Sequence, residues 1–250
     1  MLFRSEEAQN LLGAFVEKNP TAVLHRRLYA TTLRASDAKS AQRELQAVLD
    51  APRPTSGLLS ALYESNRIVA SVALFDVLFD AAERAPEAEK PARVKDLENA
   101  RVALAKALEG VTDQSALVRA DGKIALQKND PMGAIIKFND VFKKGSQIDL
   151  ELYVMTAMAN LRIQETGRAL ELVNSGLNIA PGNLALLKLR ARLELATARP
   201  RDAINTLRAL VNLFGLSYTD HSGEQTVLFG DRVRVGGAQF NTFDRPDVVT

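Results

Sequence analysis

Two pairs of basic residues carry the clearest chemistry in this sequence. Arg119 and Lys123 stand four residues apart, and Lys188 and Arg192 repeat that spacing 69 residues later. Residues four apart lie on one face of a helix, so each pair would present two cations side by side. Arginine and lysine bind carboxylates through charge-assisted hydrogen bonds. The two pairs therefore favour an acidic peptide or protein as the partner, provided that both are exposed, as we expect.

Apolar residues stand at the equivalent offsets between the two pairs, at Val154 and Met158. Methionine side chains adapt well to a bound partner. A groove that is basic, apolar and basic along its length would suit an extended acidic peptide with one apolar anchor. Arg26 and Arg27 would extend the basic lining toward the N-terminus. The alternative is that these side chains are ordinary solvated residues on exposed helix faces.

No catalytic or metal-binding pattern accompanies these residues. The chain has no cysteine and only two histidines, which excludes disulfides and thiolate metal sites. It has no G-x-S-x-G nucleophile motif, no Gly-rich phosphate loop and no H-E-x-x-H motif. Asp220, His221 and Ser222 are adjacent, but adjacency along the chain does not make a catalytic triad. We expect no enzymatic activity, no cofactor and no metal.

The charge balance and the hydropathy of the chain further limit the classes of partner that it could bind. The chain has 32 basic and 30 acidic residues, which are interspersed and argue against nucleic acid as a partner. The most apolar stretch, residues 68–79, contains Asp76 and is shorter than the roughly 20 residues that span a bilayer. The first residues lack a secretory signal. We expect a chain that does not insert into a membrane and is cytoplasmic, unless it is a fragment of an exported protein.

The elements that must position the basic pairs form an internal repeat. An alanine followed by residues at +4 and +7 recurs after 35 and then 34 residues: Ala134, Phe138 and Val141; Ala169, Val173 and Gly176; Ala203, Leu207 and Leu210. A repeat of this length is typical of a pair of helices that buries its apolar face only by stacking on its neighbours. The pattern predicts a helical solenoid.

These offsets resemble those of the tetratricopeptide repeat (TPR). In that family the second helix has small residues at consensus positions 20 and 27 and proline at 32, and Ala169, Gly176 and Pro181 match this spacing. Ala8 and Pro20 repeat its first and last positions. The resemblance implies an all-α, right-handed superhelical solenoid of antiparallel helix pairs. It implies a bacterial TPR protein, or the C-terminal part of one.

The first helices of the repeats fit the family less well. Its spacing places Asp121, Thr156 and Arg190 where a large apolar residue belongs. A slip of one residue restores an apolar face in all three units: Leu117, Ala120 and Ile124; Leu152, Met155 and Ala159; Leu186, Leu189 and Leu193. We therefore predict first helices shifted by one residue, which moves the usual glycine of the family out of its position.

The repeat also sets the domain organisation. We predict a TPR-like array over residues 1–214, most regular over residues 115–214, and a C-terminal tail over residues 215–250. Irregular spacing in the middle predicts one enlarged unit, with a long first helix across residues 56–84 and a second helix at residues 92–108. A break at Ser65–Asn66 is the alternative. The tail carries one hairpin signal, at residues 227–229 and 232–235 around Gly230–Asp231.

Two functions fit this sequence. The first is a scaffold or adaptor that binds a partner protein or peptide in the concave groove of the solenoid. The second is a regulatory or docking segment of a larger enzyme, or of a cell-envelope or export assembly protein, because the array opens on a second-type helix without its first helix. The sequence leaves the identity of the partner and the oligomeric state open.

Overall fold

The computed structural model describes residues 2–55, 57–145, 149–214, 217–219, 225–229, 232–235 and 238–241. The chain divides into two compact units, Met1–Gly145 (unit 1) and Ser146–Thr250 (unit 2). Unit 1 contains α1 (Leu2–Lys18), α2 (Val23–Leu33), α3 (Ala38–Asp50), α4 (Gly57–Arg84), the 3-10 helix η1 (Glu87–Glu89), α5 (Lys90–Ala107), α6 (Ser115–Gln127) and α7 (Pro131–Lys143). Unit 2 contains α8 (Leu150–Arg162), α9 (Thr166–Ile179), α10 (Leu184–Ala196), α11 (Pro200–Phe214) and the strands β1 (Ser217–Thr219), β2 (Gln225–Phe229), β3 (Arg232–Val235) and β4 (Ala238–Asn241).

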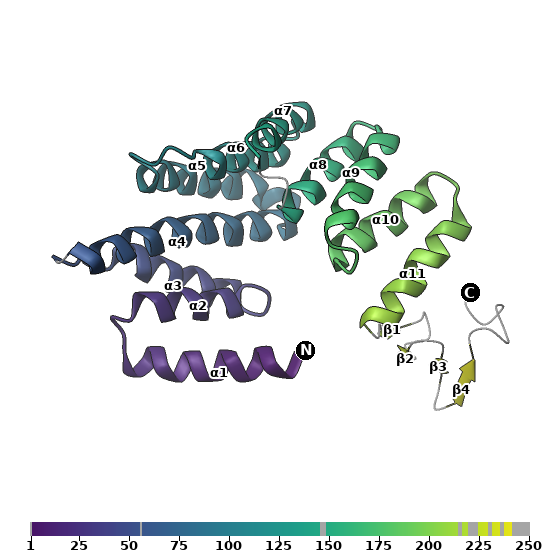
Figure 1. Ribbon diagram of the computed structural model, residues 1–250, viewed down its shortest axis with the longest axis horizontal. Helices are drawn as coiled ribbons and strands as arrows, with labels where there is room; N and C mark the ends of the chain where they lie inside the picture. The colour runs from purple at the N-terminus through teal and green to yellow at the C-terminus, as the bar shows by residue number, and fades with distance from the viewer. Residues whose placement is uncertain are drawn as a thin grey trace. The chain divides into compact units, whose positions relative to one another are not determined.

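In unit 1, each α-helix packs against the next one along the chain (Figure 1). The helix α4 also packs against α2 and α6, so these three helices form one layer. We call α2, α4, α6, α8 and α10 the first helices, and the other α-helices the second helices. Buried residues of α2, α3 and α4 form a shared core: Ala30, Leu33, Ala41, Leu45, Val48, Ala70, Leu74 and Val77. The predicted stacking of antiparallel helix pairs is confirmed.

The longest helix, α4, runs without a break from Gly57 to Arg84. The alternative of a break at Ser65–Asn66 is therefore wrong. The Asn66 side-chain amide donates to the Leu62 carbonyl over 2.8 Å, and the Ser71 hydroxyl donates to the Arg67 carbonyl over 2.9 Å. These polar side chains bond to the preceding turn of their own helix, so they do not interrupt it.

The turns inside the three regular repeats share one backbone geometry. Asn129, Gln164 and Ala198 all have a positive φ, of 57°, 65° and 54°. The next amide in each turn donates to the carbonyl five residues earlier, over 2.8 to 3.0 Å. This pairing is the usual way in which a helix satisfies its last carbonyl groups before the chain reverses. The repeat is thus visible in the backbone as well as in the side chains.

A small residue at one position brings the paired helices of each repeat together. Gly122, Ala157 and Ala191 are all buried, and each lies 12 residues before the alanine of its second helix. A Cβ atom on Gly122 would lie 2.5 Å from Cε1 of Phe138 on α7. The small residue is therefore required where the large side chain of the second helix crosses the first helix.

This position shows that the predicted slip of one residue is wrong. The apolar residues that suggested a slip are buried for another reason, since α6 packs against both α5 and α7, and α10 against both α9 and α11. A first helix with neighbours on two sides has two buried faces rather than one shifted face. The polar residues at the expected apolar position have partners nearby, as Asp121 shows by pairing with Arg101 over 2.6 Å.

In unit 2, α8 to α11 also pack in chain order, and α8 contacts α10. Asp149 and Asn183 cap the two first helices by accepting from the backbone amides of Leu152 and Leu186, over 3.3 and 3.0 Å. Caps of this kind satisfy amides that a helix start leaves without partners. The core of this unit comprises Ala157, Ala169, Val173, Leu177, Leu186, Leu187, Leu189, Leu193 and Leu210.

The tail forms an antiparallel sheet in the order β1-β2-β3-β4. In the pair β2 and β3, Phe229 lies opposite Arg232 and Val227 lies opposite Arg234. This confirms the predicted hairpin, and its turn residues Gly230 and Asp231 lie outside the described residues. The tripeptide Asp220–Ser222 lies outside them too.

Candidate partner-binding surface

The first helices of unit 2 carry an exposed basic pair. Lys188 and Arg192 are both exposed, and neither has an ion-pair partner among the residues that the structure describes. The opposite faces of α10 are anchored by Leu186, Leu189 and Leu193, all buried in the core of this unit. Packing thus fixes the rotation of α10 and directs both cations to solvent. The expected exposure of this pair is confirmed.

The first helix α8, which contacts α10, carries two partly exposed apolar side chains. Val154 and Met158 are half-buried and pack against the core of unit 2. They lie one turn apart on α8, which contacts α10. Unit 2 therefore has exposed cations on α10 and partly exposed apolar side chains on the contacting helix α8.

Other polar side chains on these helices are already occupied. Nε of Arg190 lies 2.7 Å from Oε1 of the buried Glu194, whose Oε2 accepts from the Thr206 hydroxyl over 2.7 Å. The hydroxyl of buried Thr156 donates to the Leu152 carbonyl over 2.7 Å. The bond between Thr206 and Glu194 joins α11 to α10, and the other two lie within their own helices. Lys188 and Arg192 are therefore the charged residues of α10 that have no ion-pair partner among the described residues.

The corresponding pair in unit 1 differs. Lys123 is 0 % exposed, its Nζ lies 2.7 Å from Oδ1 of Asp76 on α4, and it lies 5.1 Å from the centre of the Phe79 ring. The expectation that Lys123 is exposed is therefore wrong. Its neighbouring first helix supplies a carboxylate, so the buried ammonium has an ion-pair partner. Arg119 is half-buried and also has an interaction within the protein.

Asp76 belongs to a charged network across the first-helix layer of unit 1. Arg34, which directly follows α2, lies 2.8 Å from Asp80 and 3.8 Å from Asp76. Gln127 of α6 donates to Glu83 of α4. Acidic residues on α4 thus form ion pairs or hydrogen bonds with side chains on both sides of the helix. Sequence reasoning missed this network, although acidic residues of α4 recur at i, i+4 and i+7.

Arg26 and Arg27 are also paired within unit 1. Arg26 lies 2.6 Å from Glu44 of α3, and its Nε donates to the Pro20 carbonyl over 2.6 Å. The Nε of Arg27 donates to the Asn66 side chain of α4 over 2.9 Å. Arg26 therefore ties α2 to its second helix, and Arg27 ties it to the next first helix. The idea that they line one groove with the residues of unit 2 stays a prediction.

Neither a metal site nor a membrane span emerges in the part of the chain that the structure describes. No group of three or more His, Cys, Asp or Glu side chains in that part is placed to hold a metal ion. Likewise, none of its helices is both long and apolar enough to cross a membrane.

No protein-family model matches this sequence, and no curated protein matches it. Some solved structures are similar to this chain at low identity. YrrB, described as a TPR protein with an unusual peptide-binding site, is 13% identical, with 84% of this chain and 94% of YrrB covered and a TM-score of 0.42. MamA from Desulfovibrio magneticus is 13% identical, with 76% and 94% covered and a TM-score of 0.44. The TPR2AB domain of yeast Sti1, solved in complex with pHSP90, is 17% identical, with 82% and 83% covered and a TM-score of 0.37.

Similarity at this level shows neither a family nor a function for this chain. Within the chain itself, the helices pack in sequence order in each unit. The three pairs α6–α7, α8–α9 and α10–α11 repeat every 34 or 35 residues with the same turn geometry. Each unit is therefore a stack of helix pairs, as the repeat predicts.

Proposed function

We propose that this protein is a non-catalytic scaffold that binds an acidic segment of a partner protein through the first helices of unit 2. One observation carries the proposal: Lys188 and Arg192 are exposed cations on α10 without a carboxylate partner in the described residues, and the contacting helix α8 carries the half-buried Val154 and Met158. Charge-assisted hydrogen bonds from such cations give a bound carboxylate both affinity and orientation. Solenoids commonly use extended surfaces of this kind for binding.

The proposal assigns a role to each side chain. Lys188 and Arg192 would hold carboxylates of the partner, and Val154 and Met158 would contact an apolar side chain between or beside them. Because the cations are exposed, salt would screen them, so binding would weaken as ionic strength rises. An apolar contact alone would not show this dependence.

A peptide array tests this proposal. Acidic, neutral and basic 12-residue peptides are screened against the full chain, and the tightest acidic peptide is titrated by fluorescence anisotropy. The double variant Lys188→Glu, Arg192→Glu should lose at least tenfold in affinity, since it replaces attraction by repulsion at two contacts. The matched variant Arg168→Glu, Arg201→Glu makes the same change of charge on exposed residues of the second helices α9 and α11. It should bind within about twofold of the original chain.

Two outcomes would contradict the proposal. One is an array in which acidic peptides bind no better than neutral ones. The other is equal loss of affinity in both double variants, because the effect would then come from net charge rather than from the first helices.

A further inference from the structure

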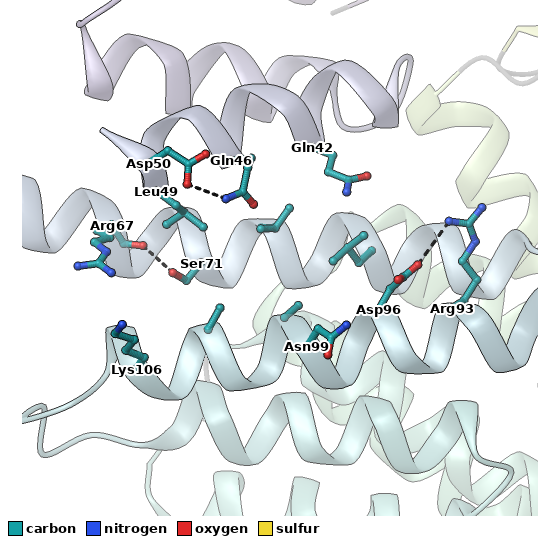
Figure 2. A pocket seen from close by; sticks show the side chains of 14 residues that line it. Gln42, Gln46, Leu49, Asp50, Arg67, Ser71, Arg93, Asp96, Asn99 and Lys106 are labelled. Carbon is teal, nitrogen blue, oxygen red and sulfur yellow. Dashed lines mark hydrogen bonds and ion pairs between the residues drawn. The ribbon is translucent and has the colours of Figure 1, made fainter. Parts of the chain in front are cut away.

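A groove of about 440 Å³ lies on the second-helix side of unit 1 (Figure 2). Its walls are α3 and α5, and its floor is α4. Within the described residues, α3 and α5 both pack on α4 and make no contact with each other. The long helix α4 therefore keeps its two neighbours apart and leaves part of its own surface open between them.

The groove combines an apolar floor with side-chain amides on both walls. Leu74 and Leu78 of α4 lie at the floor. Gln42 of α3 and Asn99 of α5 line opposite walls, are exposed, and have no hydrogen-bond partner for their amide groups in the described part of the chain. An amide group both donates and accepts, so it can bond to the N–H and C=O groups of a polypeptide whatever its sequence.

One end of the groove is cationic. Arg67 of α4 and Lys106 of α5 lie at that end in Figure 2, and neither has a carboxylate within ion-pair distance among the described residues. At the other end, Arg93 pairs with Asp96 over 3.7 Å and with Glu89 over 3.3 Å. Asp50 of α3 is labelled at the same end of the groove in Figure 2, and it accepts from Gln46 over 2.9 Å. The free positive charge is thus concentrated at one end.

The dimensions suit a short extended chain. The lining residues run for roughly 12 Å along α3 and roughly 20 Å along α5, at about 1.5 Å per helical residue. An extended polypeptide rises about 3.3 Å per residue, so about four to six residues would fill this length. Two free cations are too few for the run of phosphates of a nucleic acid, whose binding depends on many such contacts.

We propose that this groove binds a segment of a partner polypeptide in extended form. The amides of Gln42 and Asn99 would bond to the backbone of the segment, and Leu74 and Leu78 would contact an apolar side chain. An aspartate or glutamate side chain of the segment would lie between Arg67 and Lys106. This site is made of residues of α3, α4 and α5 in unit 1, so it shares no residue with the surface proposed above for unit 2.

Hexapeptide arrays test the proposal with the full chain and its variants. An array of random hexapeptides is screened with the original chain and with the variant Arg67→Glu, Lys106→Glu. We expect a set of peptides that share one acidic position and that lose at least tenfold in affinity for this variant. Replacing the acidic residue by lysine in the best peptide should restore binding to the variant, which a merely unfolded variant could not do.

Further variants separate this site from the one on unit 2. The variant Lys188→Glu, Arg192→Glu should bind the same hexapeptides within about twofold, whereas Gln42→Ala with Asn99→Ala should weaken all of them by about threefold to tenfold. Three results would overturn the proposal: no acidic position in the selected peptides, no recovery with the lysine peptide, or loss of binding only in the unit 2 variant. In the last case the hexapeptides bind at unit 2, and the proposed function stands without this groove.

Discussion

Lys123 and Arg192 stand at the same position of the repeat, 11 residues before the alanine of the second helix, and they have different surroundings. Lys123 is buried against Asp76 of the neighbouring first helix α4. Arg192 is exposed, and the neighbouring first helix α8 carries no acidic residue after Glu151 in its first turn. One carboxylate on the adjacent helix therefore decides whether the cation is part of the packing or remains available to a partner.

The difference extends to the whole first-helix layer of each unit. In unit 1, Arg34 and Lys123 neutralise acidic residues of α4 from both sides. In unit 2, the charge of Glu194 is met by Arg190 on its own helix, and the pair Lys188 and Arg192 is left over. The first layer pairs its charges between helices, whereas Lys188 and Arg192 in the second have no carboxylate partner among the described residues.

Removing the Asp76 carboxylate of unit 1 should lower the free energy of unfolding more than any other change proposed here. The substitution Asp76→Ala leaves the Lys123 ammonium buried without the carboxylate at 2.7 Å. Loss of one partner of a buried pair costs about 3–5 kcal/mol, so the free energy of unfolding should fall by about that amount in urea denaturation. Arg192→Ala should change it by less than about 0.5 kcal/mol, as exposed residues usually do. Similar values for the two variants would refute the contrast.

Enlarging the small residue Gly122 should lower the free energy of unfolding by an intermediate amount. In Gly122→Ala, the new Cβ would lie 2.5 Å from the Phe138 ring, and overpacking of this kind costs about 1–3 kcal/mol. In the third repeat, Ala191 and the smaller Leu207 stand at the equivalent positions. Phe138→Leu should therefore recover part of the loss in Gly122→Ala, so that the double variant is more stable than the two single changes predict. Thermal and urea denaturation of the four chains measure this; additive losses would contradict it.

Glycine substitutions in the turns of the two units should give the smallest change in the free energy of unfolding. Asn129 and Ala198 have the same left-handed backbone, but alanine tolerates a positive φ less well than asparagine or glycine does. Ala198→Gly should raise the free energy of unfolding by about 0.5–1 kcal/mol, whereas Asn129→Gly should gain less. A loss of stability in Ala198→Gly would show that the turn is not strained.

The sequence was sufficient for the repeat because the repeat is local. Alanine and its +4 and +7 partners share one helix face, so their spacing predicts the second helices, and α4 and the hairpin β2–β3 follow from equally local patterns. The first helices have two buried faces, and residue spacing alone does not distinguish two buried faces from one face shifted by a residue. The close approach of Gly122 to Phe138 makes this distinction.

The candidate site depends on contacts between distant residues, which spacing alone does not reveal. Lys123 and Lys188 belong to pairs with the same spacing, but Asp76 lies 47 residues before Lys123. Only the layer formed by α4 and α6 brings these two side chains together. The same reason explains Arg27, whose partner Asn66 lies 39 residues away. Charge pairs along the chain could be predicted, and their burial could not.

Amine labelling of the native chain tests the central contrast most directly. A short exposure to an amine-reactive acetylating reagent, followed by mass spectrometry of the peptides, compares the two lysines in one molecule. We predict that Lys188 reacts as fast as other exposed lysines such as Lys39 and Lys137, and that Lys123 reacts only after the chain is unfolded in urea. Equal labelling of Lys123 and Lys188 in the native chain would contradict the account.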